Sequence, residues 1–229
     1  MRLIPFRLRT FHRWHALVMS LVVVMSASSG LIHTWMAHTQ APPPPARPVG
    51  EVSLTRATVS PASLPGPASG VSLRTIGNAP WWQVIPTDGG RLRWFDAQTG
   101  AEDGAADERY AREIAHSALG TETVTQDAYL TAFDSEYLAI FRILPVYRFS
   151  AGDTAGTRVY VSTLTGSVTR LNDDRWQFEA MVFTLLHKWM LISKRTVRDW
   201  ALMIAMTGLV VLALSGLALF WQTRRAPRS

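Results

Sequence analysis

Residues 200–223 read WALMIAMTGLVVLALSGLALFWQT, and no side chain in this run is charged. Arg224 and Arg225 follow the run directly. At about 1.5 Å of rise per residue, a helix of this length crosses a hydrocarbon core of roughly 30 Å. We therefore predict a transmembrane helix over residues 199–222 and a short tail over 223–229.

A second charge-free run lies near the start of the chain, between Trp14 and Ala46. Its segment 15–37, HALVMSLVVVMSASSGLIHTWMA, predicts a transmembrane helix over residues 14–38. A cleaved signal peptide is the alternative, because a basic start and a cluster of small residues at 26–29 also fit one. The apolar run continues beyond that cluster to Met36, which favours a retained anchor.

The distribution of charge predicts the orientation of both helices. The 229 residues carry a formal charge of +6, with four arginines in residues 1–13 and three after residue 223. No Asp or Glu occurs in residues 1–40 or 200–229. Because basic flanks stay in the cytoplasm, segments 1–13 and 223–229 are expected there, with the central domain in the periplasm of a bacterial inner-membrane protein.

The remaining composition excludes several classes of function. Without the seven terminal arginines, the chain carries 16 basic and 17 acidic residues, so a nucleic-acid surface is disfavoured. The chain contains no cysteine, which excludes disulfides, thiolate metal sites and a cysteine nucleophile. No G-x-S-x-G or Gly-rich dinucleotide motif is present, which disfavours a hydrolase and leaves a nucleotide or flavin to bind elsewhere.

The central region predicts an α+β domain between the two helices. Residues 39–70 are rich in proline and predict a linker with little fixed structure, and residues 71–175 form the domain. Alternation and turn signals predict strands, and helical spacing followed by Gly120 predicts one helix. The strands are expected at 81–86, 91–96, 142–150 and 158–162, and the helix at 107–119. The matching endings WFDAQTGAE and YVSTLTGSV indicate two degenerate repeats, and residues 176–198 predict an amphipathic helix and turn at the membrane surface.

Four of the six histidines lie in or beside the first predicted span. An ionisable residue inside a membrane is costly enough to indicate function. His15 and His33 are 18 residues apart, which is five helical turns, so they share a face. His12 lies one turn before His15, and His187 lies in an apolar segment expected at the membrane level of His33. His38 and His116 are expected to face solvent.

Paired neutral imidazoles suit the axial positions of haem b. His33 and His187 form the candidate pair at the outer level, whereas His12 and His15 share one helix and cannot clamp opposite sides of a macrocycle. An inner haem would therefore need a homodimer. For the four candidate ligands, the alternative is a polar role in helix packing. These candidates are His12, His15, His33 and His187. A direct iron or copper site is weaker, because no carboxylate accompanies these positions in the sequence.

Several short motifs resemble those of PepSY domain-containing and PepSY-associated transmembrane proteins. They are Phe11-His12-Arg13-Trp14, Ser29-Gly30-Leu31, the segment LHKWML at 186–191, Arg195-Thr196-Val197 and the ending SGLALFW at 215–221. This family includes iron-regulated membrane proteins and ferric-siderophore reductases. The resemblance implies haem held by transmembrane histidines and electron transfer to a periplasmic ferric siderophore. The second span of this chain contains no histidine.

A non-enzymatic role remains the alternative function. In that case the chain is a membrane-anchored PepSY module that binds or regulates a periplasmic protein partner. PepSY units occur as regulatory modules as well as in membrane proteins, so the domain does not decide between the two roles. The presence or absence of haem colour separates them.

Overall fold

The computed structural model describes residues 4–39, 54–121, 123–138 and 143–224. The chain divides into two compact units. The helical unit contains residues 1–41 and 178–229, and the α+β unit contains residues 42–177. Each unit is described by itself.

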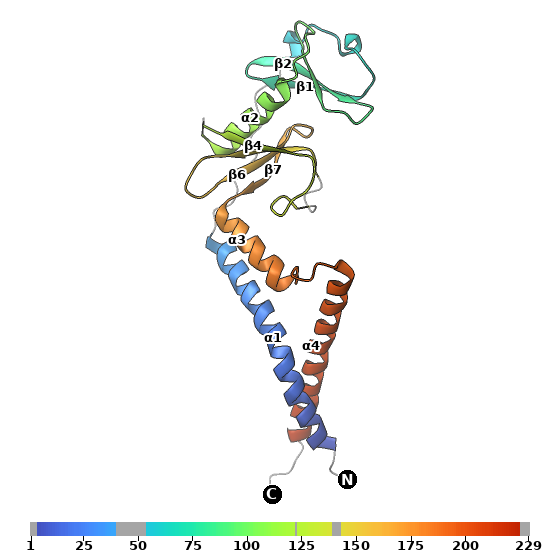
Figure 1. Cartoon of the computed structure of the whole chain (residues 1–229), viewed down its shortest axis with the longest axis vertical. Coiled ribbons are helices and arrows are strands. Elements are labelled where there is room, and N and C mark those ends of the chain that lie inside the picture. Colours follow the sequence, from blue (N-terminus) through green and yellow to red (C-terminus); the bar gives the residue numbers. More distant parts are fainter. Residues whose placement is uncertain (1–3, 40–53, 122, 139–142, 225–229) are drawn as a thin grey trace. The chain divides into compact units, whose positions relative to one another are not determined.

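Two long helices dominate the helical unit (Figure 1). Helix α1 spans Ile4–Thr39 and α4 spans Arg195–Arg224, and both are long and apolar enough to cross a membrane. They contain the predicted spans 14–38 and 199–222. Most of their large apolar side chains are exposed, including Leu17, Leu31 and Leu214.

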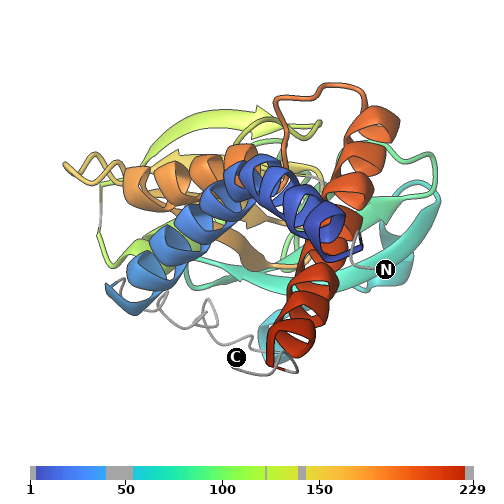
Figure 2. The ribbon, with the colours of Figure 1, turned by 90° about the horizontal axis from the view of Figure 1, so that it is seen from below.

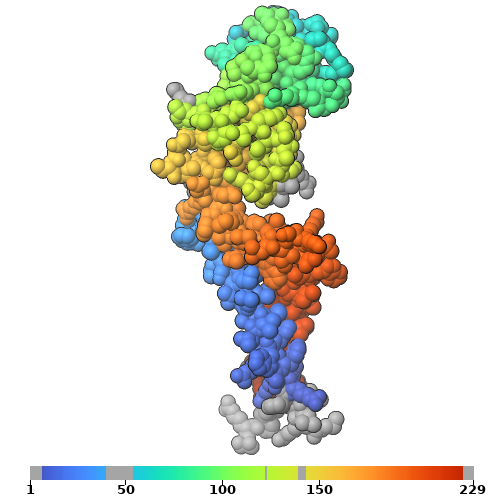
Figure 3. Space-filling model, viewed as in Figure 1, coloured from blue at the N-terminus to red at the C-terminus, as the bar shows by residue number. Residues whose placement is uncertain are grey.

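The two helices are antiparallel and meet through small residues. The C-terminal part of α4 lies beside the N-terminal part of α1 (Figures 1 and 2), and their surfaces touch there (Figure 3). A Cβ on Gly208 would lie 2.7 Å from Met19 Sδ, so any larger residue would require the Met19 side chain to move. Ala205 and Ser215 are buried in the same contact. Small residues at such a contact let two helices approach closely.

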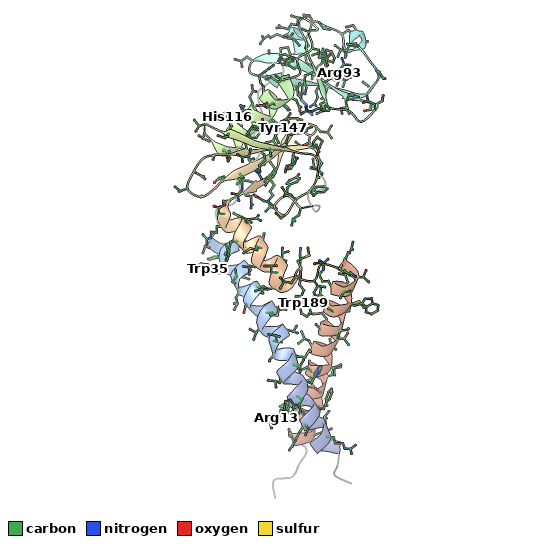
Figure 4. All side chains as sticks on the ribbon, viewed as in Figure 1. Arg13, Trp35, Arg93, His116, Tyr147 and Trp189 are labelled. Atoms are coloured by element: carbon green, nitrogen blue, oxygen red, sulfur yellow. The ribbon has the colours of Figure 1, made fainter. Side chains whose placement is uncertain are left out.

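The connection into α4 is not one amphipathic helix. Helix α3 spans Asp174–Val182 and continues as a π-helical turn, η4, over Phe183–His187. A turn follows, in which Trp189 adopts a positive φ of 51° (Figure 4). Phe178 and Met181 are exposed on α3 while Glu179 is buried, the reverse of an amphipathic helix in water. The amphipathic helix and turn expected over 176–198 correspond here to α3, the π-helical turn η4 and the turn before α4, and the exposed side of α3 is apolar.

The α+β unit contains two antiparallel sheets. The first has the order β1-β2-β3 and the second β4-β5-β6-β7. The strands of the first sheet are β1 Ala68–Ile76, β2 Ala79–Pro86 and β3 Arg93–Asp96. Those of the second are β4 Thr125–Leu130, β5 Val146–Ser150, β6 Arg158–Ser162 and β7 Ser167–Asn172.

One helix serves both sheets. Helix α2 spans Ala106–Leu119 at the predicted place and ends at Gly120, whose φ of 65° suits glycine. Its buried face, with Tyr110 and Ile114, joins a single core with Trp94 of β3 and Phe149 of β5. Both sheets therefore share one helix and one core.

The predicted linker is structured over its second half. Residues 54–70 contain two short 3₁₀ turns and the start of β1. The Val59 N–H donates to Ala97 O at 2.9 Å, and Trp82 Nε1 donates to Val59 O at 2.9 Å. The expectation of little fixed structure was wrong here, because β2 supplies hydrogen-bond partners that a local reading of Pro, Ser and Gly does not reveal. The remainder of the linker, residues 40–53, lies outside the described residues.

A buried ion pair in the α+β unit predicts a pH-dependent stability. Glu136 Oε1 accepts hydrogen bonds from Arg158 Nε at 2.7 Å and Asn172 Nδ2 at 2.8 Å. Burial opposes ionisation, but these bonds outweigh it and hold the pKa of Glu136 below its ordinary 4.5. A lowered folded-state pKa stabilises the fold above pH 4.5, and this stabilisation is lost as the pH falls through the folded-state pKa.

Glu136→Gln should therefore unfold more easily than the parent chain at neutral pH, and the difference should shrink to nothing in acid. Urea denaturation of the purified chain measures this difference when unfolding is monitored by hydrogen exchange in peptides of β6 and β7. A difference in unfolding free energy that stays constant from pH 7 to about 3 would show that the Glu136 charge contributes nothing.

Candidate ligand site in the helical unit

The structure brings His33 and His187 to one cluster of side chains. His33 lies on α1 and His187 ends η4. The Phe183 ring contacts both imidazoles, with centroids 5.6 Å from His33 and 4.6 Å from His187. His33 Nδ1 bonds Glu179 Oε1, and His187 Nδ1 lies 3.2 Å from Ser29 Oγ. The two histidines predicted as a pair thus share a neighbourhood.

The partners of these imidazoles determine which ring nitrogen carries the proton. Ser29 Oγ donates its own proton to Ser26 O at 2.9 Å, so it accepts from His187 Nδ1. The Glu179 carboxylate likewise accepts from His33 Nδ1. In its neutral form, each ring therefore carries the proton on Nδ1 and presents a bare lone pair on Nε2. Metal-ligating histidines commonly have this arrangement, with the second nitrogen bonded to an acceptor.

His12 and His15 differ from each other at the α1–α4 contact. Ser215 Oγ donates to Leu212 O at 2.9 Å and accepts from His12 Nδ1 at 2.7 Å, which leaves His12 Nε2 bare. His15 Nε2 instead donates to Gly208 O at 2.7 Å. Since this bond engages His15 Nε2, whereas His12 Nε2 is bare, the geometry favours His12 over His15 as a ligand through Nε2.

Glu179 is the residue that sequence reasoning missed. Its side chain is 8% exposed, and Oε2 has no hydrogen-bond partner among the described residues. The expectation that no carboxylate accompanies the histidines was wrong, because α3 folds back onto α1 and brings Glu179 to His33 across 146 residues. A signal was present, since Glu179 is the only acid between Asp174 and Asp199. An acid in such an apolar run is costly without a partner.

The other two histidines lie apart from this cluster. His38 is exposed near the end of α1, as expected. His116 is half-buried on α2 (Figure 4), where Nδ1 donates to Thr121 O at 2.8 Å across the helix end. His116 therefore has a structural role rather than the solvent-facing position that was expected. Within the described ranges, no group of three or more His, Asp or Glu side chains is positioned to hold a metal ion.

Comparisons with protein-family models, curated proteins and solved structures gave no match. The resemblance to PepSY-associated transmembrane proteins thus stays a prediction that rests on the short motifs quoted above. The geometry of the helical unit is then the main guide to function.

Proposed function

We propose that this chain is an inner-membrane haem protein that passes electrons to a ferric chelate in the periplasm. The first part of the proposal is insertion of α1 and α4 into the bilayer with both ends in the cytoplasm. The exposed apolar surface of both helices supports it, because such a surface is unfavourable in water. The arginines near the start of α1 and after the end of α4 support this orientation. Figure 4 labels one of them, Arg13, on α1.

The observation that carries the haem proposal is the pair of bare Nε2 atoms on His33 and His187. Each ring is oriented through Nδ1 by an acceptor from a different segment, Glu179 or Ser29. Two such imidazoles would hold the iron of haem b, and bound haem would supply a one-electron carrier at this level. Glu179 and Ser29 act as positioning residues, because they hold the ring planes and keep the proton off Nε2.

Phe183 limits the space beside the two imidazoles in which haem could bind. Its ring lies against both of them, so a macrocycle reaching both Nε2 atoms within one chain has to share that space with Phe183. The His33 side chain is 55% exposed, and His187 is also exposed. A second copy could therefore supply the opposite ligand. The homodimer expected for the inner level from sequence thus suits the outer level as well.

At the inner level, His12 is the proposed ligand. A Cβ on Gly216 would lie 3.2 Å from His12 Cε1, so glycine leaves room beside this ring. A homodimer would bring one His12 from each copy to the same level. Ligand groups at both levels would allow an electron from a cytoplasmic donor to reach the outer face, where reduction of Fe(III) to Fe(II) loosens its hold on a siderophore.

Purified protein from cells grown with ample haem tests this function. We expect a pyridine haemochrome of type b and a dithionite-minus-oxidised spectrum typical of paired imidazole ligands. Colourless protein after such growth would remove the electron-transfer function.

A second candidate, a colourless membrane-anchored module, is favoured by one observation. Each of the four candidate ligands already has a hydrogen-bond partner within the chain; these are His12, His15, His33 and His187. Helix packing alone can therefore account for them. In that case the α+β unit binds or regulates a periplasmic protein, and the absence of a Soret band is the expected result.

A further inference from the structure

The α+β unit contains a cavity of about 490 Å³, within the range typical of small-molecule sites. It lies where the end of β2 and the β2–β3 loop meet the end of β4 and the segment before β5. Its walls are mostly apolar and include Ile85, Leu92, Leu144 and Leu164. Leu164 is 38% exposed at the rim, so the apolar lining continues to the surface.

One cation belongs to this apolar wall. The Arg91 guanidinium lies over the Tyr129 ring, with Cζ 4.7 Å from the ring centroid. The Tyr129 ring packs on Tyr147 at 4.7 Å, and Tyr147 OH donates to Asp107 Oδ2 at 2.9 Å. Figure 4 labels Tyr147, which is buried behind this wall. The stack anchors the guanidinium, which has five N–H donors and bonds Tyr129 with part of this set.

Arg91 forms no salt bridge with a carboxylate among the described residues, although Tyr129 is its hydrogen-bond partner and Asp107 also stabilises its charge. The ion pairs among the described residues join other arginines to carboxylates and do not include Arg91. The nearby Asp88 carboxylate accepts from the Gly90 N–H at 2.9 Å, within its own turn. A guanidinium without an acid partner beside an apolar cavity complements an anion that carries apolar surface.

The position of the cavity distinguishes between ligand classes. A peptide that extends a sheet needs the free backbone groups along the edge of a strand. This cavity lies at the strand ends, where Pro86 and Pro145 line it and offer no N–H. A compact molecule held by apolar contact and one charge suits such a site better than an extended polypeptide.

We propose that this cavity binds a small organic anion with a flat apolar body, and that Arg91 contacts its charged group. Tyr129 and Leu164 would cover the body of the ligand. The inference goes beyond the proposed function, because it rests on the α+β unit alone and holds whether or not the histidines bind haem.

Photo-crosslinking of the purified full chain tests the site by location. The probe is 4-benzoylbenzoate, an aromatic carboxylate, and its neutral amide, 4-benzoylbenzamide, is the matched probe. Peptide mass spectrometry then maps the adducts, so probe dissolved in detergent does not obscure the result. We expect adducts within 85–92 and 129–131 from the carboxylate, and about tenfold fewer from the amide, since a charge-assisted hydrogen bond is lost.

Variants separate the charge from the shape of the site. Arg91→Gln should lower labelling by the carboxylate about tenfold, and Arg91→Lys should retain part of this labelling. Arg109→Gln is the control, because Arg109 is exposed on α2, and it should leave the labelling unchanged. Leu164→Trp should lower labelling by both probes by filling the rim. Adducts confined to the helical unit, or equal labelling of parent and Arg91→Gln by the carboxylate, would overturn the proposal. Hydrogen exchange of β5 and β6 establishes that each variant is folded.

Discussion

His187→Ala and His33→Ala should each lower the haem bound per chain at least tenfold, with loss of the Soret band. Each substitution removes one imidazole and with it one Nε2 ligand. The Nδ1 of the imidazole that remains is already bonded to Ser29 or Glu179, so this nitrogen does not replace the lost Nε2. Optical spectra and pyridine haemochrome assays of purified variants measure the loss. His38→Ala is the matched control on the same helix, because His38 is exposed outside the cluster.

The positioning residues should give a graded result. Both variants leave the two ligands in place. Ser29→Ala removes the acceptor that orients His187, and Glu179→Gln replaces the carboxylate at His33 by a neutral amide oxygen, a weaker acceptor. Removal of such an acceptor typically weakens metal affinity by about 10- to 100-fold, and its replacement by an amide should weaken it less. Glu179→Gln should also shift the reduction potential, because it removes a negative charge next to a ligand. Ser28→Ala, which neighbours Ser29 on α1, should behave like the parent. Full haem content in both His33→Ala and His187→Ala would show that these histidines serve only helix packing.

Asp107→Ala should destabilise the α+β unit by about 2–4 kcal/mol. One carboxylate serves two buried groups, since Trp94 Nε1 donates to Oδ1 and Tyr147 OH donates to Oδ2, both at 2.9 Å. Alanine leaves both donors buried without a partner. Asp107 also lies in the first turn of α2, where a negative charge is favourable.

Chemical denaturation followed by hydrogen exchange in peptides of β3 and β5 measures this loss. Asp103→Ala is the matched control, because its pair with Arg109 is exposed and contributes at most about 1 kcal/mol. Asp107→Asn should lie between the two, since its amide oxygen accepts only one of the two bonds. Equal stability of Asp103→Ala and Asp107→Ala would mean that Trp94 and Tyr147 find other acceptors.

Part of the α+β unit was predictable because its signals are local. Helix α2 follows from apolar residues at helical spacing and from Gly120, and β6 follows from alternation over Arg158–Ser162. Strands β1, β4 and β7 were not predicted. Their sequences are polar or rich in small residues, so their conformation depends on hydrogen bonds to β2, β5 and β6. Propensity in such segments is overridden by pairing.

The amino-acid sequence by itself determined the two long apolar helices, because helix formation over a charge-free run satisfies every backbone group locally. It also determined which residue types those helices present, including four histidines. Only the tertiary structure decided which histidines have a bare Nε2. That property depends on acceptors from distant segments, such as Ser29 for His187 and Glu179 for His33. A hydrogen-bond partner more than a hundred residues away has no local sequence signal, since only the packing of η4 and α3 against α1 brings the two together.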